Sequence, residues 1–285
     1  MKKLRKISSV MLKVGVSGVL LYFVFRKIPF SEIGKLIKTS NPLFLILALG
    51  VFGLSQMISS QRLLLYFHAQ NFLIHKTDNF KLYLLGMFYN FFIPGGVGGD
   101  AYKIYTLHKK FRWNIKKLTK SVFCDRISGL FAIILLIEGL MTMMLSGALK
   151  LLIIPIVITT IFLARLFFRT YFPQFKNIFY QTLLYSLSVQ VLQLVSVYFI
   201  LKSLMQVDGM VLYFVVFLIS STLSIISFSG IGVREWLFMK AAQYFTFNPD
   251  ISVSAAVLFS FITAIVAFAG LCFYHFKYKT DTYSS

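Results

Sequence analysis

The residues of this chain that could do chemistry are a few polar side chains set within or beside long apolar stretches. Charged residues make up only 13% of the sequence, whereas 58% of its residues are hydrophobic. A charge at membrane depth is costly, so it lines a polar cavity or pairs with another charge. The candidates of this kind are Asp100, Asp125, Arg126, Glu138, Arg234 and Glu235.

Two glycine-rich segments lie beside these charges. Residues 94–100 contain one proline and four glycines, and residues 230–235 contain two glycines before an arginine. A helix does not continue through such a segment, so backbone N–H groups become free to hold an anion such as a phosphate. Arg234 is the natural phosphate ligand, because its planar guanidinium donates to two oxygens. The alternative is that the glycines only allow helices to pack closely.

These segments predict a site for a lipid headgroup. We expect Asp100 and Glu235 to position Arg234 or to meet a cationic headgroup. The predicted headgroup-binding residues are Pro94, Gly95, Gly96, Gly98, Gly99, Asp100, Asp125, Arg126, Gly230, Gly232, Arg234 and Glu235.

Other polar side chains lie inside the apolar segments. Asp125 and Arg126 are adjacent, so on a helix they point to different faces and need different partners. They form either an interfacial pair at the cytoplasmic rim or part of a lipid path. Glu138 is protonated, paired or close to the external rim, and it is a candidate for proton coupling. Gln190 and Gln193 share a helix face, which favours interhelical hydrogen bonds over ligand binding. The candidates for lining a pathway are Arg62, Asn90, Glu138, Gln190 and Gln193.

Motifs for metal, cofactor or nucleophile chemistry are missing from the sequence. Cys124 and Cys272 lie in apolar segments without the spacing of metal ligands, and the four histidines are scattered. Gly96, Gly98 and Ala101 match a dinucleotide fingerprint by accident, because no strand precedes them. We therefore expect no metal, no cofactor and no catalytic residue.

The elements that must position these residues are transmembrane helices. Lys and Arg number 29 against 9 Asp and Glu, for a formal net charge of +20. In a soluble protein this excess would suggest nucleic acid. Here the cations lie between apolar runs, so they indicate topology and contact with anionic lipid. The composition excludes a soluble enzyme, a disordered scaffold and a secreted disulfide scaffold, and helices satisfy the backbone in lipid.

Eight apolar segments are present. Two of them are interrupted or closed by the glycine breaks at corresponding places in the two halves of the chain, as in inverted-repeat transporters. The basic start has the charge layout of a signal peptide but no cleavage site, which predicts an uncleaved first span. The segments are 10–25, 43–61, 80–93, 121–147, 151–168, 178–201, 210–228 and 252–276.

Positive charge predicts the orientation of these segments. Lysines and arginines at 103–120 and at 76–81 place both flanks of the first break in the cytoplasm. Residues 80–106 are then a re-entrant hairpin, and residues 210–246 are a second hairpin entering from outside. We expect an all-α polytopic protein with about six transmembrane helices, two opposed hairpins and both termini in the cytoplasm. Eight full spans are the alternative. The cations between residues 26 and 38 would lie outside, against the usual rule.

Three segments resemble signatures of the lysylphosphatidylglycerol synthase transmembrane-region family, the flippase-like integral membrane proteins. Residues 90–103 read NFFIPGGVGGDAYK, residues 125–130 read DRISGL, and residues 230–235 read GIGVRE. Arg62 also matches a recurring arginine of the family. The resemblance extends from the first span to about residue 275. The family usually has a proline and an extra glycine before the third signature. In this chain the corresponding residues, 227–229, read SFS.

The resemblance implies lipid handling without aminoacyl transfer. Lysyl-transferring members carry a soluble catalytic domain after the membrane part, and we expect a single membrane domain over residues 1–285 without it. We interpret the chain as a flippase-like lipid transporter of the inner (plasma) membrane, not an enzyme. It would move a phospholipid or a lipid-linked amphiphile between leaflets.

Two alternatives stay open. One is an intramembrane lipid-modifying transferase that uses Asp100 or Asp125, and the other is an ion-coupled carrier of small solutes. The expected partners are membrane lipids, anionic or lipid-linked, and a lipid-synthesising enzyme; we expect no nucleic acid. Assembly into an oligomer is left open.

Overall fold

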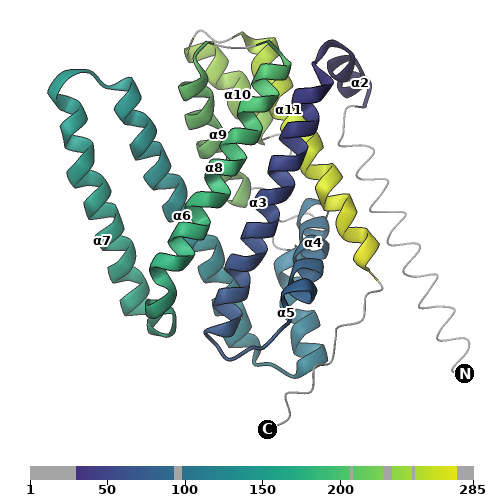
Figure 1. The fold of residues 1–285 in the computed structure, drawn as a ribbon, viewed down its shortest axis with the longest axis vertical. Helices are drawn as coiled ribbons and strands as arrows, with labels where there is room; N and C mark the ends of the chain where they lie inside the picture. The colour runs from purple at the N-terminus through teal and green to yellow at the C-terminus, as the bar shows by residue number, and fades with distance from the viewer. Residues whose placement is uncertain (1–29, 93–97, 206–207, 227–232, 246–247, 275–285) are drawn as a thin grey trace, which may run out of the picture.

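The computed structural model describes residues 30–92, 98–205, 208–226, 233–245 and 248–274, and the ordered elements in these ranges are helices (Figure 1). The α-helices are α2 (Phe30–Thr39), α3 (Pro42–His68), α4 (Lys76–Phe92), α5 (Gly98–Phe111), α6 (Ile115–Met144), α7 (Ile153–Tyr171), α8 (Phe179–Ser203), α9 (Met210–Ile226), α10 (Val233–Tyr244) and α11 (Pro249–Ala269). Short 3-10 turns η1 (Gly147–Leu152), η2 (Pro173–Ile178) and η3 (Gly270–Phe273) extend α7, α8 and α11.

Five helical stretches within the described residues are long and apolar enough to cross a membrane. They are Pro42–His68, Ile115–Met144, Leu149–Tyr171, Pro173–Ser203 and Pro249–Phe273. Each matches an apolar segment predicted from the sequence, and the predicted span 10–25 lies outside the described residues. The chain is therefore a helical, multi-pass integral membrane protein, as its composition predicts.

Asparagines begin three of these long helices. The side chain of Asn41 accepts a hydrogen bond from the backbone of Leu43 at 3.0 Å, and Asn248 caps α11 in the same way. Each is followed by a proline, whose missing N–H costs nothing in the first turn of a helix. Asn114 caps α6 by accepting from Lys117 N at 3.2 Å. The cap explains why α6 starts six residues before its apolar run at 121.

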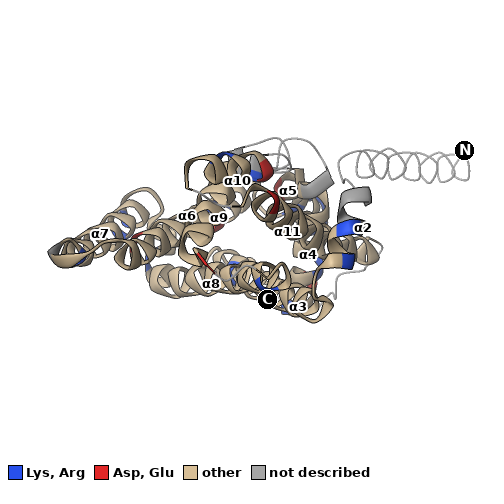
Figure 2. Cartoon of the chain, turned by 90° about the horizontal axis from the view of Figure 1, so that it is seen from above, with Lys and Arg blue, Asp and Glu red and all other residues tan. Residues whose placement is uncertain are grey.

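The long antiparallel pair α3 and α8 forms one side of the bundle. Polar contacts join the two helices over their length: Ser196 Oγ donates to the carbonyl of Ala48 at 2.9 Å, and Tyr66 donates to Thr182 at 3.1 Å. Viewed along the bundle, α9, α10, α11, α4 and α5 lie across from this pair (Figure 2). The largest apolar cluster joins both sides through buried residues such as Phe52 and Phe259, whose rings meet edge to face.

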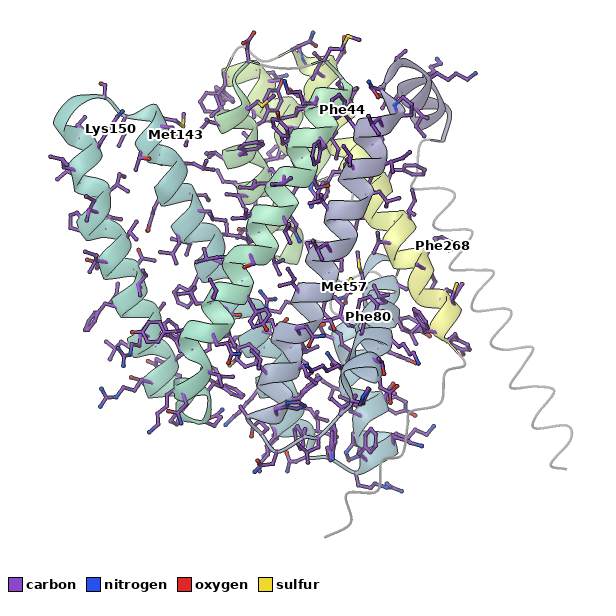
Figure 3. All side chains as sticks on the ribbon, viewed as in Figure 1. Phe44, Met57, Phe80, Met143, Lys150 and Phe268 are labelled. Carbon is purple, nitrogen blue, oxygen red and sulfur yellow. The ribbon has the colours of Figure 1, made fainter. Side chains whose placement is uncertain are left out.

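Helix α7 stands apart from the rest of the bundle. It packs mainly against α6 and the adjoining turns, and Figure 3 shows Met143 near the upper end of α6 and Lys150 at the turn that leads into α7. Most of the large apolar side chains of α7 are exposed, which suits a surface that faces lipid tails rather than water. They include Ile154, Ile156, Ile158, Phe162, Leu163 and Leu166.

The glycine-rich breaks separate two pairs of shorter helices. Helices α4 and α5 pack against each other in the lower half of Figure 1, whereas α9 and α10 pack against each other in the upper half. In the sequence an amphipathic stretch follows each break, at residues 101–118 and 235–246. The helices that form the second arm of each pair have other bounds: α5 covers 98–111, and α10 covers 233–244. Helix α5 ends early because Arg112 has a φ of 58°, which breaks the helical path before α6.

Candidate functional site

A buried ion pair connects α3 to α6. Arg62 Nε lies 2.7 Å from Asp125 Oδ1, and its Nη2 donates to Oδ2 at 3.2 Å. The remaining nitrogen, Nη1, donates to Ser186 Oγ of α8 at 2.9 Å. Both charged side chains are only 7% exposed. Because every nitrogen of Arg62 has an acceptor, this pair is a closed unit that fixes α3, α6 and α8 relative to one another.

A second ion cluster lies one residue further along α6. Arg126 Nε donates to Asp100 Oδ2 at 2.9 Å, and Arg126 Nη2 lies 2.9 Å from the same oxygen. Lys103 Nζ lies 2.8 Å from Asp100 Oδ1, without the alignment of a hydrogen bond. One carboxylate of α5 thus faces two cations, and the cluster carries a net charge of +1.

These two clusters confirm that Asp125 and Arg126 point to different faces and use different partners. Asp125 faces α3, and Arg126 faces α5. Asp100 pairs with Arg126 and Lys103 and forms no ion pair with Arg234. The alternative role of Asp100, contact with a cationic headgroup, stays a prediction.

Two of the predicted glycines lie where α5 meets α4. The backbone N–H of Gly99 donates to Asn90 Oδ1 at 2.8 Å, so Asn90 ties the end of α4 to the start of α5. A Cβ at Gly99 would overlap the carbonyl oxygen of Gly86 in α4, at 1.7 Å. Gly99 therefore permits close helix contact, which was the alternative reading of these glycines. Gly98 is the first residue of α5, whereas Pro94, Gly95 and Gly96 lie outside the described residues.

At the second break, Arg234 lies near the start of α10. Its guanidinium carbon is 4.6 Å from the ring centre of Phe259 and 5.4 Å from that of Phe217. Among the described residues no Asp or Glu forms an ion pair with Arg234, and its Nε is buried without a hydrogen-bond partner. Glu235 instead accepts from Ser260 Oγ of α11 at 2.8 Å. Gly230 and Gly232 lie outside the described residues.

The three remaining predicted polar residues are separate from these clusters. Glu138 on α6 faces α7, where Thr160 donates to Oε1 at 2.6 Å and Oε2 is buried without a partner. Gln190 on α8 is buried, and its Oε1 has no hydrogen-bond partner in the described part of the chain. Gln193, one turn further along α8, is half-buried. Gln190 Oε1 therefore does not accept the interhelical hydrogen bond that the sequence predicts for the two glutamines.

Sequence reasoning missed Lys103, which it assigned to the basic cytoplasmic stretch. Lys103 is only 4% exposed, pairs with Asp100 and lies 4.9 Å over the ring of Tyr83. Gly86 leaves the space for it, because a Cβ there would lie 2.7 Å from Lys103 Cε. The signal was the spacing of three residues between Asp100 and Lys103, which puts both on one helix face.

Among the described residues, no group of three or more His, Cys, Asp or Glu side chains could hold a metal ion. What the described residues offer instead is positive charge at two places inside the bundle, the Arg126–Lys103 cluster and Arg234. Such positions suit an anion with several acceptor oxygens.

Comparison with known proteins agrees with the signatures in the sequence. The family model described as lysylphosphatidylglycerol synthase TM region matches residues 10–270. No curated protein and no solved structure matches the chain. The matched range contains α2 to α11 with both ion clusters and Arg234, so the chain belongs to the lysylphosphatidylglycerol synthase TM-region family.

Proposed function

We propose that this protein binds the phosphate of a lipid headgroup inside the membrane and moves the lipid between leaflets of the cell's inner membrane. Membership of a family described by a lysylphosphatidylglycerol synthase membrane region supports the handling of lipid. The observation that carries the proposal is Arg234, a guanidinium whose buried Nε has no partner and which forms no ion pair with any described carboxylate.

The two short helix pairs support a binding place at mid-depth. The described parts of the arms α4, α5, α9 and α10 have 17, 14, 17 and 12 residues, which correspond to lengths of about 18 to 26 Å. The hydrocarbon core of a bilayer is about 30 Å thick, so these helices suit re-entrant hairpins better than full spans. On this interpretation α4 and α5 enter from one side and α9 and α10 from the other, in addition to the spanning helices.

The charge distribution supports an orientation with the lower end of Figure 1 in the cytoplasm. The end of α5 and the start of α6 carry a dense set of exposed cations, as cytoplasmic loops do. They are Lys109, Lys110, Arg112, Lys116, Lys117 and Lys120. Arg126 is then about 17 Å from the cytoplasmic start of α6, and Arg234 is about 15 Å from the external end of α10, by helix rise.

Energetics explains why such an arrangement would speed the movement of a lipid. A charged headgroup loses its water in the hydrocarbon core, which is the main barrier to crossing. Cations held at mid-depth replace that water while the acyl chains remain in lipid. The proposed substrate is therefore an amphiphile with a phosphate in its headgroup.

Mass spectrometry of lipids that co-purify with the gently solubilised protein tests the proposal. We expect one phosphate-containing lipid class to be enriched on the wild-type protein and reduced about tenfold on Arg234→Ala, since a charge-assisted hydrogen bond contributes about 1.5–3 kcal/mol. Arg165→Ala is the matched control, because Arg165 is an exposed arginine that also stacks on an aromatic ring, that of Tyr180. Identical, bulk-like lipid profiles on all three proteins would contradict the proposal.

A further inference from the structure

The cluster of Asp100, Lys103 and Arg126 is an incomplete version of the nearby Arg62–Asp125 pair. Arg62 uses all three of its nitrogens, on two carboxylate oxygens and one hydroxyl. Arg126 directs Nε and Nη2 at a single oxygen of Asp100, and its Nη1 has no hydrogen-bond partner among the described residues. The cluster therefore has spare donors.

The cluster also has spare charge. Two cations face one carboxylate, so one positive charge is not neutralised inside the cluster. Lys103 is 5% exposed at its side chain, and it lies beside Asp100 Oδ1 without hydrogen-bond alignment. A buried cation that shares its carboxylate partner with a second cation is expected to take another anion if one can reach it.

A ligand can reach Arg126. Its side chain is 34% exposed, against 7% for that of Arg62. Arg126 lies eleven residues after the start of α6, about 17 Å by helix rise, so an anion that contacts it lies well inside the membrane. The two clusters thus differ in access as well as in hydrogen bonding.

We propose that Arg126 and Lys103 form a binding site for a phosphate monoanion, and that Asp100 is an internal anion that competes with this ligand for both cations. The inference rests on the proposed function and adds a second anion site, at the hairpin opposite Arg234. A phosphate has more acceptor oxygens than a carboxylate and would use the free Nη1 of Arg126. One phosphate monoanion would also neutralise the cluster.

The competing carboxylate gives the site the affinity that transport needs. A passage site must bind its ligand well enough to admit it and weakly enough to release it. Two unopposed buried cations would retain a phosphate, whereas Asp100 takes over the cations as the phosphate leaves. Asp100 therefore makes release easier at the expense of affinity.

Native mass spectrometry of the full-length protein, titrated with phosphatidylglycerol, tests the inference. We expect Asp100→Asn to bind the lipid about tenfold more tightly than the wild type, because it removes the competing charge at nearly constant shape. Arg126→Gln added to Asp100→Asn should cancel the gain. Asp250→Asn is the matched control and should give no gain, because it removes an exposed carboxylate in the first turn of α11 that is not part of the cluster. Equal or weaker binding by Asp100→Asn would overturn the inference.

Lys103→Met gives a second test that does not depend on the folding of Asp100→Asn. It removes one cation from the site, so we expect about tenfold weaker binding of phosphatidylglycerol, and unchanged binding would count against the site. A parallel titration with inorganic phosphate identifies the source: competition with the lipid means that the phosphate group alone is recognised, and its absence means that the acyl chains are required. Phosphatidylglycerol binding that is lost in Arg234→Ala but unaffected by changes at Asp100 and Lys103 would defeat this inference alone. No binding to any variant would defeat the proposed function too.

Discussion

At the level of single residues, the arginines inside the described part of the bundle are either fully paired or retain unpaired donors. Arg62 and Asp125 satisfy each other almost completely, whereas Arg126 and Arg234 retain donors without acceptors in the described structure. A buried charge left without its partner is strongly destabilising, so the first arrangement is structural. The second leaves donors available for a ligand.

This difference predicts the effect of removing one partner of the closed pair. Arg62→Ala leaves Asp125 buried and unpaired, and we expect it to lower the stability of the protein by about 3–5 kcal/mol. Thermal unfolding in detergent would measure the loss against Lys117→Ala, which removes an exposed cation at the start of α6. The double change Arg62→Met with Asp125→Leu should recover most of the stability, since no charge is then left alone. If Arg62→Ala unfolds at the same temperature as the wild type, the Arg62–Asp125 pair does not have this structural role.

The partners of the charged residues in the candidate site could not be predicted from the sequence. The positions of Asp125 and Arg126 on different faces of α6 followed from their adjacency, but their partners did not. Arg62 and Asp125 are 63 residues apart, and Arg126 and Asp100 are 26 apart. Pairing at such separation is decided by how helices pack, which no local pattern encodes.

At the scale of helices, the hairpin of α4 and α5 depends on glycines at its contact. Gly99→Ala would push a methyl group into the backbone of α4 at Gly86, so the two helices must separate. We expect a loss of about 1–3 kcal/mol or more, seen as a lower unfolding temperature. Gly53→Ala in α3 is the control, because nothing lies within 4 Å of a Cβ there, and it should be neutral or gain up to about 1 kcal/mol. Equal effects of the two substitutions would contradict this packing.

Helix positions were predicted well from apolar length, and helix ends were predicted less well. Five apolar segments became long helices because only a helix satisfies its own backbone in lipid. The glycine-rich segment was expected to extend to residue 100, yet α5 begins at Gly98. Close contact with Gly86 and the hydrogen bond that Gly99 N–H donates to Asn90 Oδ1 favour a helical Gly99, and both are tertiary effects.

At the scale of the whole molecule, the interpretation of the short helices as opposed hairpins predicts which connections share a side of the membrane. Cysteines placed at Lys76 and Lys110, in a background without Cys124 and Cys272, should react with a membrane-impermeant maleimide from the cytoplasmic side only. Cysteines at Met205 and Tyr244 should react from the external side only. All four positions are exposed. Labelling of Lys76→Cys and Lys110→Cys from opposite sides would instead support eight full spans.

Transport of phosphate-bearing lipids across the bilayer is measured most directly by a leaflet-resolved assay. Purified protein is placed in vesicles with phosphatidylglycerol that carries a fluorophore on one acyl chain, and dithionite then destroys the fluorophores of the outer leaflet. We predict that inner-leaflet lipid becomes accessible at least about tenfold faster with the wild type than with Arg234→Ala or without protein. Equal rates in all three samples would contradict the account.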